Sequence, residues 1–215
     1  MELLIANKNY SSWSMRPWLV LSYFGLPFDE RTVWLGEADT EQAIRRDSPS
    51  GRVPCLIDGE QVIWDSLAIC ETLAERYPQL PLWPRDAAQR ARARAICAEM
   101  HSGFQGLRES MWMNLHASGF AGQGATPAAL ADIARIETIF QSCLLASGGP
   151  FLFGDFSIAD AMYAPVVMRF NIYRPALSAT TMAYCERITA LPDVQDWIAQ
   201  AGDEGHRIAR YEART

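Results

Sequence analysis

Two short stretches of the chain place hydroxyl and acidic side chains beside a predicted helix start. Ser11-Ser12-Trp13-Ser14 precedes a helical stretch that Arg16-Pro17 opens, and Asp65-Ser66 opens another. The first N–H groups of a helix lack partners and carry the positive end of its dipole, so they bind anions. At Asp65-Ser66 the carboxylate could hold an amine while the helix start holds a carboxylate. This combination suits the α-amino acid end of a ligand, and a plain helix cap is the alternative.

The serine turn supports two interpretations. Its hydroxyls can cap the following helix, or one of them can donate a hydrogen bond to a bound thiolate. A free thiol has a pKa near 8.5, and lowering it by about two units needs roughly 2.7 kcal/mol of preferential anion stabilisation. A hydroxyl together with a helix N-terminus could supply this amount. The local sequence leaves both interpretations open.

Arg52-Val53-Pro54 leads into a predicted strand and is a third candidate binding element. A proline that heads a strand can follow a cis peptide bond. The backbone groups of the preceding residue would then be unpaired and available to a peptide-like ligand.

Composition excludes several classes of protein. The 215 residues suit one large domain or two modest ones, and 19 Lys and Arg against 25 Asp and Glu argue against a nucleic-acid partner. Five cysteines without a C-x-x-C pair or metal-like spacing predict reduced thiols, no metal and a cytoplasmic location. No apolar run approaches the roughly 18 residues that span a bilayer. His101, His116 and His206 are scattered along the sequence, and we expect each to be an ordinary surface or core histidine, although His101 and Arg108 lie on one stretch and could touch a ligand.

The first 77 residues alternate between predicted strands and helices. Strands are expected at residues 2–6 and 28–35 and on both sides of the Asp58-Gly59 turn, with helices at 16–24, 37–46 and from Asp65 onward. The order β-α-β-α-β-β-α describes a small α/β unit. We therefore expect one domain over 1–78, followed by a stiff linker over 79–86, because three prolines occur within residues 78–84.

The second half, 87–215, is predicted to be all-helical. Helices are expected over 86–117, from Thr126 to a break at Ser147, over 157–173, over 178–190 and over 193–201. The helix at 157–173 is apolar nearly all round except at Arg169 and Asn171, which predicts burial at the centre of a bundle. Ser157 and Asp160 form a capping box that we expect to be structural.

These features together resemble a cytosolic glutathione S-transferase. The resemblance rests on Ser-Ser before the first helix, Val-Pro before the third strand, Asp-Ser at the third helix, and the helical half with Gly154-Asp155-Phe156-Ser157-Ile158-Ala159-Asp160 near its middle. It implies a thioredoxin-like domain followed by an all-helical domain. The sequence is most similar to the serine-type zeta and theta-like bacterial classes, because Ser11-Ser12-Trp13-Ser14-Met15-Arg16 matches the zeta pattern Ser-Ser-Cys-Ser-x-Arg except at Trp13.

The resemblance implies a role for each of these motifs. Ser11 or Ser12 would activate the thiol of glutathione, with a slight preference for Ser11. Trp13 replaces the cysteine of the zeta motif, which argues against maleylacetoacetate isomerase activity and against mixed-disulfide chemistry. The glutathione site would be formed by Arg52, Val53, Pro54, Asp65, Ser66 and Gln105.

The second substrate would lie between the serine turn and the segment 103–115. The pocket is predicted to be hydrophobic and to include Trp13, Phe104, Arg108 and Trp112, although domain or dimer packing could equally explain these side chains. The implied function is a homodimeric detoxification transferase that attacks a hydrophobic electrophile or a peroxide. A non-catalytic glutathione-binding or regulatory module and a glutathione-dependent isomerase are the alternatives.

Overall fold

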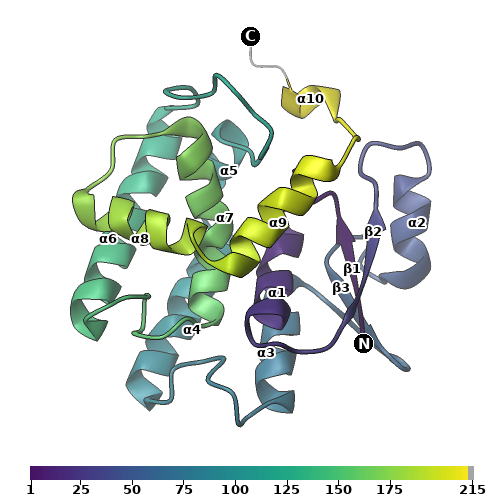
Figure 1. Ribbon diagram of the computed structural model, residues 1–215, viewed down its shortest axis with the longest axis horizontal. Coiled ribbons are helices and arrows are strands. Elements are labelled where there is room, and N and C mark those ends of the chain that lie inside the picture. The colour runs from purple at the N-terminus through teal and green to yellow at the C-terminus, as the bar shows by residue number, and fades with distance from the viewer. Residues whose placement is uncertain (213–215) are drawn as a thin grey trace.

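The computed structural model describes residues 1–212 and contains one four-stranded sheet (Figure 1). The strands are β1 (Glu2–Ala6), β2 (Asp29–Val33), β3 (Cys55–Asp58) and β4 (Gln61–Trp64). Their order across the sheet is β2-β1-β3-β4. β2 runs parallel to β1, whereas β3 is antiparallel to both of its neighbours, β1 and β4.

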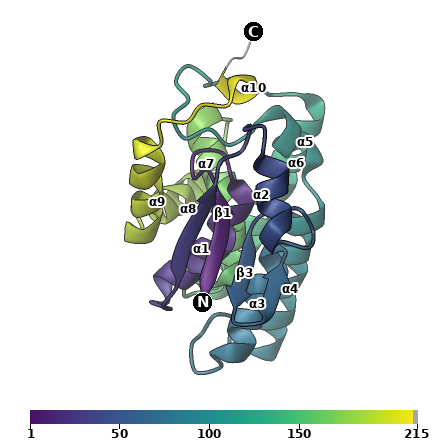
Figure 2. The ribbon, with the colours of Figure 1, turned by 90° about the vertical axis from the view of Figure 1, so that its right-hand side faces the viewer.

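Helices cover both faces of this sheet. They are α1 (Ser12–Tyr23), α2 (Thr40–Asp47) and α3 (Ser66–Arg76). Side chains alternate across β1, so Leu3 and Ile5 join the main core while Leu4 packs with Ile44 of α2. Figures 1 and 2 show α2 on one side of the sheet and α1 on the other. The predicted β-α-β-α-β-β-α order is confirmed.

The second half is helical, as predicted. Its helices are α4 (Ala87–Ser102), α5 (Gln105–Ser110), α6 (Pro127–Ser147), α7 (Ile158–Tyr173), α8 (Ala179–Thr189), α9 (Pro192–Asp203) and α10 (Ala209–Glu212). None of the helices in residues 1–212 is long and apolar enough to span a bilayer.

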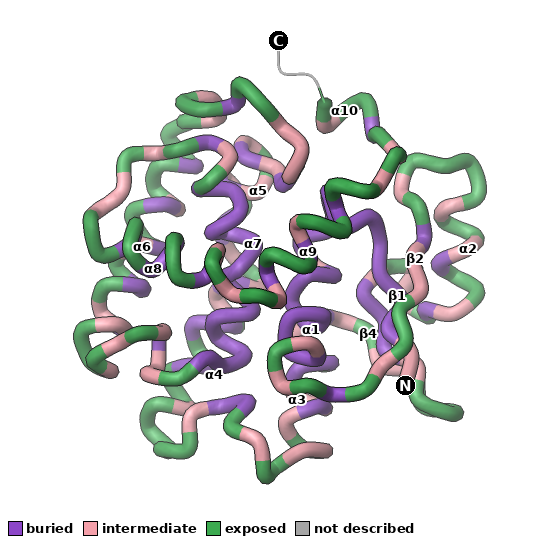
Figure 3. The backbone as a smooth tube through the Cα atoms, in the orientation of Figure 1, coloured by how far each residue is buried: buried purple, intermediate pink, exposed green. Residues whose placement is uncertain are grey.

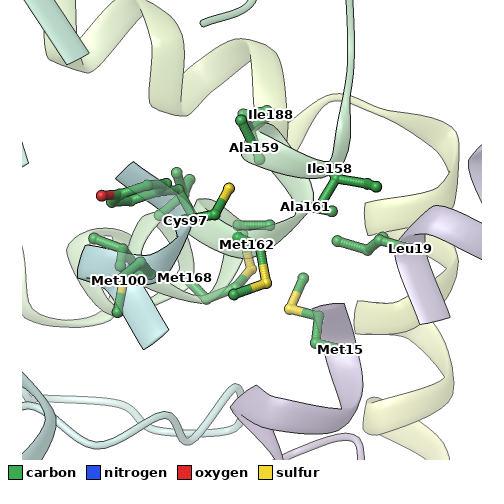
Figure 4. Packing of buried hydrophobic residues seen from close by; sticks show 14 of the residues in the cluster. Met15, Leu19, Cys97, Met100, Ile158, Ala159, Ala161, Met162, Met168 and Ile188 are labelled. Carbon is green, nitrogen blue, oxygen red and sulfur yellow. The ribbon is translucent and has the colours of Figure 1, made fainter. Parts of the chain in front are cut away.

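The two halves share one hydrophobic core around α7. This helix is buried on nearly every side, as its apolar sequence predicts, and Figure 3 shows it in the interior beside α1. Met15 and Leu19 of α1 point toward Met162 and Ile158 of α7 (Figure 4). The N-terminal end of α1 is therefore fixed by contacts from the helical half.

The structure corrects two predicted helix boundaries. The helix expected at 16–24 begins earlier, at Ser12, with Ser11 as its N-cap and Pro17 inside its second turn. The helix expected over 86–117 ends at Ser102, because Gly103 and Phe104 leave the helical conformation. A Cβ atom at Gly103 would lie 2.7 Å from the carbonyl oxygen of Glu99, so this chain reversal requires glycine.

The buried carboxylate of Asp160 gives a test of the core. It accepts hydrogen bonds from the backbone of Leu152 and Ser157, and from the hydroxyl of Tyr184. Asp160→Ala would leave these donors unpaired, and we expect it to lower the free energy of unfolding by about 3 kcal/mol in urea titrations. Asp155→Ala, at an exposed position nearby, is the control and should change it by less than about 0.5 kcal/mol. Equal losses in the two variants would contradict the structural role of Asp160.

Candidate active site

A cavity of about 830 Å³ lies between the sheet domain and the start of the helical half. All six residues predicted to bind glutathione line it. The full lining is Trp13, Ser50, Arg52, Val53, Pro54, Trp64, Asp65, Ser66, His101, Gln105 and Arg108. The folded chain therefore brings together residues that are widely separated in the sequence.

Asp65 and Ser66 present both a carboxylate and a buried hydroxyl at the start of α3. Asp65 caps this helix by accepting a hydrogen bond of 2.9 Å from Leu67 N, and its other oxygen lies 3.1 Å from His101 Nε2. Ser66 is 1% exposed, and its Oγ has no hydrogen-bond partner among the described residues. The cap interpretation is thus correct for Asp65 but does not account for the Ser66 hydroxyl. A buried hydroxyl without a partner fits a ligand carboxylate at this helix start.

The Val53-Pro54 segment also lines the first cavity. The Val53-Pro54 peptide bond is cis, and Val53 lies just before the β3 ladder begins at Cys55. The neighbouring Arg52 is exposed, and its carbonyl accepts a hydrogen bond of 2.7 Å from Ser48. Arg52, Val53 and Pro54 all line the cavity.

A second cavity of about 540 Å³ adjoins the first. Both cavities are lined by Trp13, Arg52, Val53 and Arg108. The second is also lined by both serines of the serine turn and by the predicted Trp112, together with Tyr10, Leu35, Ile44, Gly51, Glu109, Met113, Arg169 and Tyr211. The predicted Phe104 reaches neither lining, because it is 6% exposed and packs in the main core.

The two candidate serines differ in their hydrogen bonds. The Ser11 hydroxyl donates to Ser14 Oγ at 2.7 Å and caps α1 by accepting from the Ser14 backbone. The Ser12 hydroxyl instead accepts a hydrogen bond of 3.2 Å from Arg169 Nη2. Ser11 is therefore engaged in holding the helix start, whereas the Ser12 hydroxyl donates to no acceptor within residues 1–212.

Three arginines surround the serine turn and make it electropositive. Burial, followed by repulsion from its arginine neighbours, lowers the pKa of Arg16 to about 9, and burial followed by repulsion from Arg108 lowers the pKa of Arg169 to about 10. Arg16 and Arg169 therefore stay largely charged at neutral pH. The ring of Trp13 lies 4.1 Å from the Arg16 guanidinium and 5.2 Å from that of Arg108. Such a site favours anions, including a thiolate or a carboxylate.

Several lining residues were not predicted from the sequence. Ser50 and Trp64 line the first cavity, and Tyr10, Arg169 and Tyr211 line the second. Only Arg169 gave a signal, because it is a charged residue within an apolar helix. His101, which shares a stretch of the sequence with Arg108, contacts Asp65 on the cavity wall.

Comparisons with known proteins agree with this geometry. Residues 10–76 match the model of the glutathione S-transferase N-terminal domain, and residues 123–200 match that of the C-terminal domain. A probable maleylacetoacetate isomerase of Caenorhabditis elegans is 31% identical over 172 residues, which are 78% of each chain. The chain belongs to the glutathione S-transferase family. The predicted family, enzyme class and glutathione cosubstrate are thereby confirmed.

Other relatives of this transferase fall in the predicted class. A zeta-class glutathione S-transferase of Euphorbia esula is 30% identical and covers 86% of this chain and 88% of its own. The structure of a maleyl pyruvate isomerase, a bacterial zeta-class transferase, matches with a TM-score of 0.72 at 25% identity, covering 95% of this chain and 100% of its own. A glutathione transferase homologue from Burkholderia with bound glutathione also matches with a TM-score of 0.72, at 27% identity, covering 94% and 97%.

Within residues 1–212, no group of three or more His, Cys, Asp or Glu side chains could hold a metal ion. The charged side chains that line the two cavities are Arg52, Arg108 and Arg169 together with the carboxylates Asp65 and Glu109.

Proposed function

We propose that this protein binds glutathione in the first cavity and ionises its thiol at the serine turn for attack on an electrophile in the second cavity. The observation that carries the proposal is the junction of the two cavities at Trp13, next to Ser11 and Ser12. A ligand that fills the first cavity can extend a thiol to this junction. The thiol would then meet the helix start and an electropositive surrounding.

The residues of the first cavity suit the parts of glutathione. The Asp65 carboxylate would bind the γ-glutamyl amine, and the Ser66 hydroxyl with the start of α3 would bind the γ-glutamyl carboxylate. The backbone of Val53, beside Pro54, would pair with the cysteinyl unit. Arg52 would bind the glycyl carboxylate, and Gln105 would bind from the helical half.

Ser12 is the better candidate for the hydrogen bond to the thiolate. Its oxygen accepts from Arg169, a charged donor, which polarises the hydroxyl and strengthens its own donation. The proton of Ser11 already lies toward Ser14. This assignment revises the slight sequence-based preference for Ser11. The hydroxyl stabilises the developing charge and does not act as a covalent nucleophile.

The second cavity favours an electrophile that carries a carboxylate. Its predicted aromatic side chains, Trp13 and Trp112, are accompanied by three guanidinium groups, those of Arg52, Arg108 and Arg169, and by one carboxylate, Glu109. The positive charge of these arginines attracts a carboxylate, which a purely apolar pocket could not do. We therefore narrow the predicted hydrophobic electrophile to one with an apolar body and an anionic end.

The decisive experiment measures the ultraviolet absorbance of the thiolate of bound glutathione against pH. We expect the bound thiol of the wild type to have a pKa about two units below that of free glutathione. Ser12→Ala should remove most of this shift, whereas Ser11→Ala should remove less of it. If Ser11→Ala removes more, Ser11 is the thiol contact. If bound glutathione ionises as it does in free solution, the protein is a binding module without thiol activation.

The glutathione site itself is tested by Ser66→Ala. Because the Ser66 Oγ has no partner among residues 1–212, its loss should change the free energy of unfolding by less than about 0.5 kcal/mol. The same variant should weaken glutathione binding about tenfold, as measured by calorimetry. Ser102→Ala, at the exposed end of α4, is the matched control and should alter neither quantity. Unchanged glutathione affinity in Ser66→Ala would contradict the site assignment.

A glutathione-dependent isomerase is the second candidate. The named isomerases among the relatives and the pair of arginines favour it, although Trp13 departs from the zeta motif. In this reaction the thiolate would add to a conjugated carbon–carbon double bond, the resulting single bond would rotate, and the thiolate would leave again. The electron pair returns to the double bond, so glutathione is not consumed.

The stoichiometry of glutathione separates these two activities. With maleylpyruvate or maleylacetoacetate as substrate, an isomerase converts many equivalents while free glutathione stays constant, as followed by thiol titration. With an aryl or alkyl halide, a transferase consumes one equivalent for each halide released. We expect the second behaviour. Conversion of maleyl substrates at constant glutathione, without turnover of halides, would instead establish the isomerase.

We also propose a homodimer with a cytoplasmic location. β4 is an edge strand of the sheet, and its Trp64 is 45% exposed beside the first cavity. An exposed edge with a large apolar side chain is a suitable contact for a second copy. Sedimentation equilibrium would reveal a monomer if the dimer proposal is wrong.

The cysteines support the cytoplasmic location. All five are free and buried, as in a reducing compartment. Fractionation of the native cells would test the location.

A further inference from the structure

Two segments that are distant in the sequence lie side by side at the second cavity. One runs from Asn9 to Ser12 and contains both candidate serines, and we call it the serine segment. The other runs from Met111 to His116 in the loop after α5, and we call it the facing segment. The N–H of Leu115 donates a hydrogen bond of 3.3 Å to the Asn9 carbonyl, so the two backbones are in contact. Residues of both segments line the second cavity.

The side chains of Asn9 and Asn114 join these segments as a buried amide pair. Asn9 is 0% exposed and Asn114 is 1% exposed. Asn9 Nδ2 donates a hydrogen bond of 3.0 Å to Asn114 Oδ1, and the N–H of His116 donates to the Oδ1 atoms of both residues, at 3.0 and 3.1 Å. Asn114 Nδ2 in turn donates to the Tyr211 carbonyl at 3.0 Å and to the Glu212 carboxylate at 3.1 Å. Each nitrogen and oxygen of the two amides is therefore bonded, and such a network fixes the position of both side chains.

Arg169 cross-links the same two segments at their other ends. Its Nη2 donates a hydrogen bond of 3.2 Å to Ser12 Oγ, and its Nε donates one of 2.8 Å to the Met111 carbonyl. The serine segment is thus tied to the facing segment at Asn9 and again, through the guanidinium, at Ser12. Arg169 is buried in α7 and also donates to the Pro165 carbonyl one turn earlier, so its guanidinium has little freedom to follow a serine segment that moves away.

The loop before the serine segment is anchored independently of this pair. Asn7 Oδ1 accepts a hydrogen bond of 2.8 Å from Leu35 N, and the Lys8 ammonium pairs with the Glu30 carboxylate of β2. Both of these contacts lie within the sheet domain, whereas the Asn9 side chain crosses to the helical half. Loss of the Asn9 amide should therefore release the serine segment from the facing segment without detaching the loop.

We propose that the Asn9–Asn114 pair positions Ser12 against Arg169 and so aligns the Ser12 hydroxyl with the thiolate of bound glutathione. The inference rests on the proposed function. Neither asparagine lines either cavity, so the pair acts through Ser12 and not by contact with a ligand. The strength of a hydrogen bond falls steeply with poor distance and angle, and Arg169 can polarise the Ser12 hydroxyl only while the two are held together. Asn9 and Asn114 are thus positioning residues.

The first test removes the Asn9 amide with Asn9→Ala. This variant leaves neither partner of that amide unbonded, because the N–H of His116 and Asn114 Oδ1 still bond each other. We expect the pKa of the bound thiol, followed by its ultraviolet absorbance, to rise by about one unit, since the thiolate loses an aligned donor. Asn171→Ala, which removes the exposed hydrogen bond from Asn171 to Thr189, is the matched control and should leave that pKa unchanged. A wild-type thiol pKa in Asn9→Ala would overturn the proposal.

Binding and turnover of the same variant distinguish positioning from a general defect. S-methylglutathione has no ionisable thiol, and its Kd in Asn9→Ala should stay within about twofold of the wild type, because Asn9 does not line the first cavity. With an aryl halide, kcat should fall about tenfold at a pH below the thiol pKa and should recover at high pH, where the bound thiol ionises in both proteins. A loss of kcat that is equal at every pH would show a merely structural role and overturn the proposal.

The second test asks whether the pair acts through Ser12. Ser12→Ala removes the hydroxyl, so Asn9→Ala should raise the thiol pKa no further in that background. Asn114→Ala should raise it as Asn9→Ala does, because each substitution removes one end of the same hydrogen bond. A further rise in the Ser12→Ala background, or a wild-type thiol pKa in Asn114→Ala, would contradict the positioning role.

The behaviour of the wild type separates this inference from the proposed function. If wild-type protein fails to ionise glutathione, the proposed function is wrong. If it ionises glutathione and Ser12→Ala removes the shift, while Asn9→Ala and Asn114→Ala keep it, only the role of the amide pair is wrong.

Discussion

The packing of α1 against α7 is the contact on which the arrangement of the site depends. α1 carries the serine turn at its N-terminal end, and α7 carries Arg169. Buried side chains of both helices belong to one core, and the hydrogen bond from Arg169 to Ser12 joins the two halves directly at the serine turn. A shift of one helix along the other would separate these groups. The junction of the two cavities is therefore as rigid as the core beneath it.

The electrostatics of the junction follow from the same packing. Arg169 is buried, and it also donates hydrogen bonds to the carbonyls of Met111 and Pro165. Arg16 is 1% exposed, and its Nε and Nη1 have no partner among the residues that the structure describes. Burying such charges opposes folding, and their lowered pKa values express this cost. The burial of these two positive charges at the cavity junction is consistent with a site that binds anions.

Much of the fold could be predicted because its signals are local. Turn residues, caps and apolar periodicity gave the order of the strands and helices, and Val53, Asp65 and Ser66 line a common cavity as the sequence motifs suggested. Phe104 was misplaced because glycine at 103 ends α4 and a left-handed residue then redirects the chain. Tyr10 and Tyr211 were missed because their roles arise from contacts between segments about 200 residues apart, which leave no periodic pattern.

Trp13 lines both cavities and stands where the zeta motif has a cysteine. A cysteine there would offer a second thiol beside glutathione, and thus a route to a mixed disulfide. The indole cannot form that bond; instead it contacts the guanidinium groups of Arg16 and Arg108, packs edge-to-face with His101 and lines both cavities. Cation–π contacts hold arginines without neutralising them. Trp13 therefore stands where the zeta motif has a redox-active group, and its ring holds positive charge beside the serine turn.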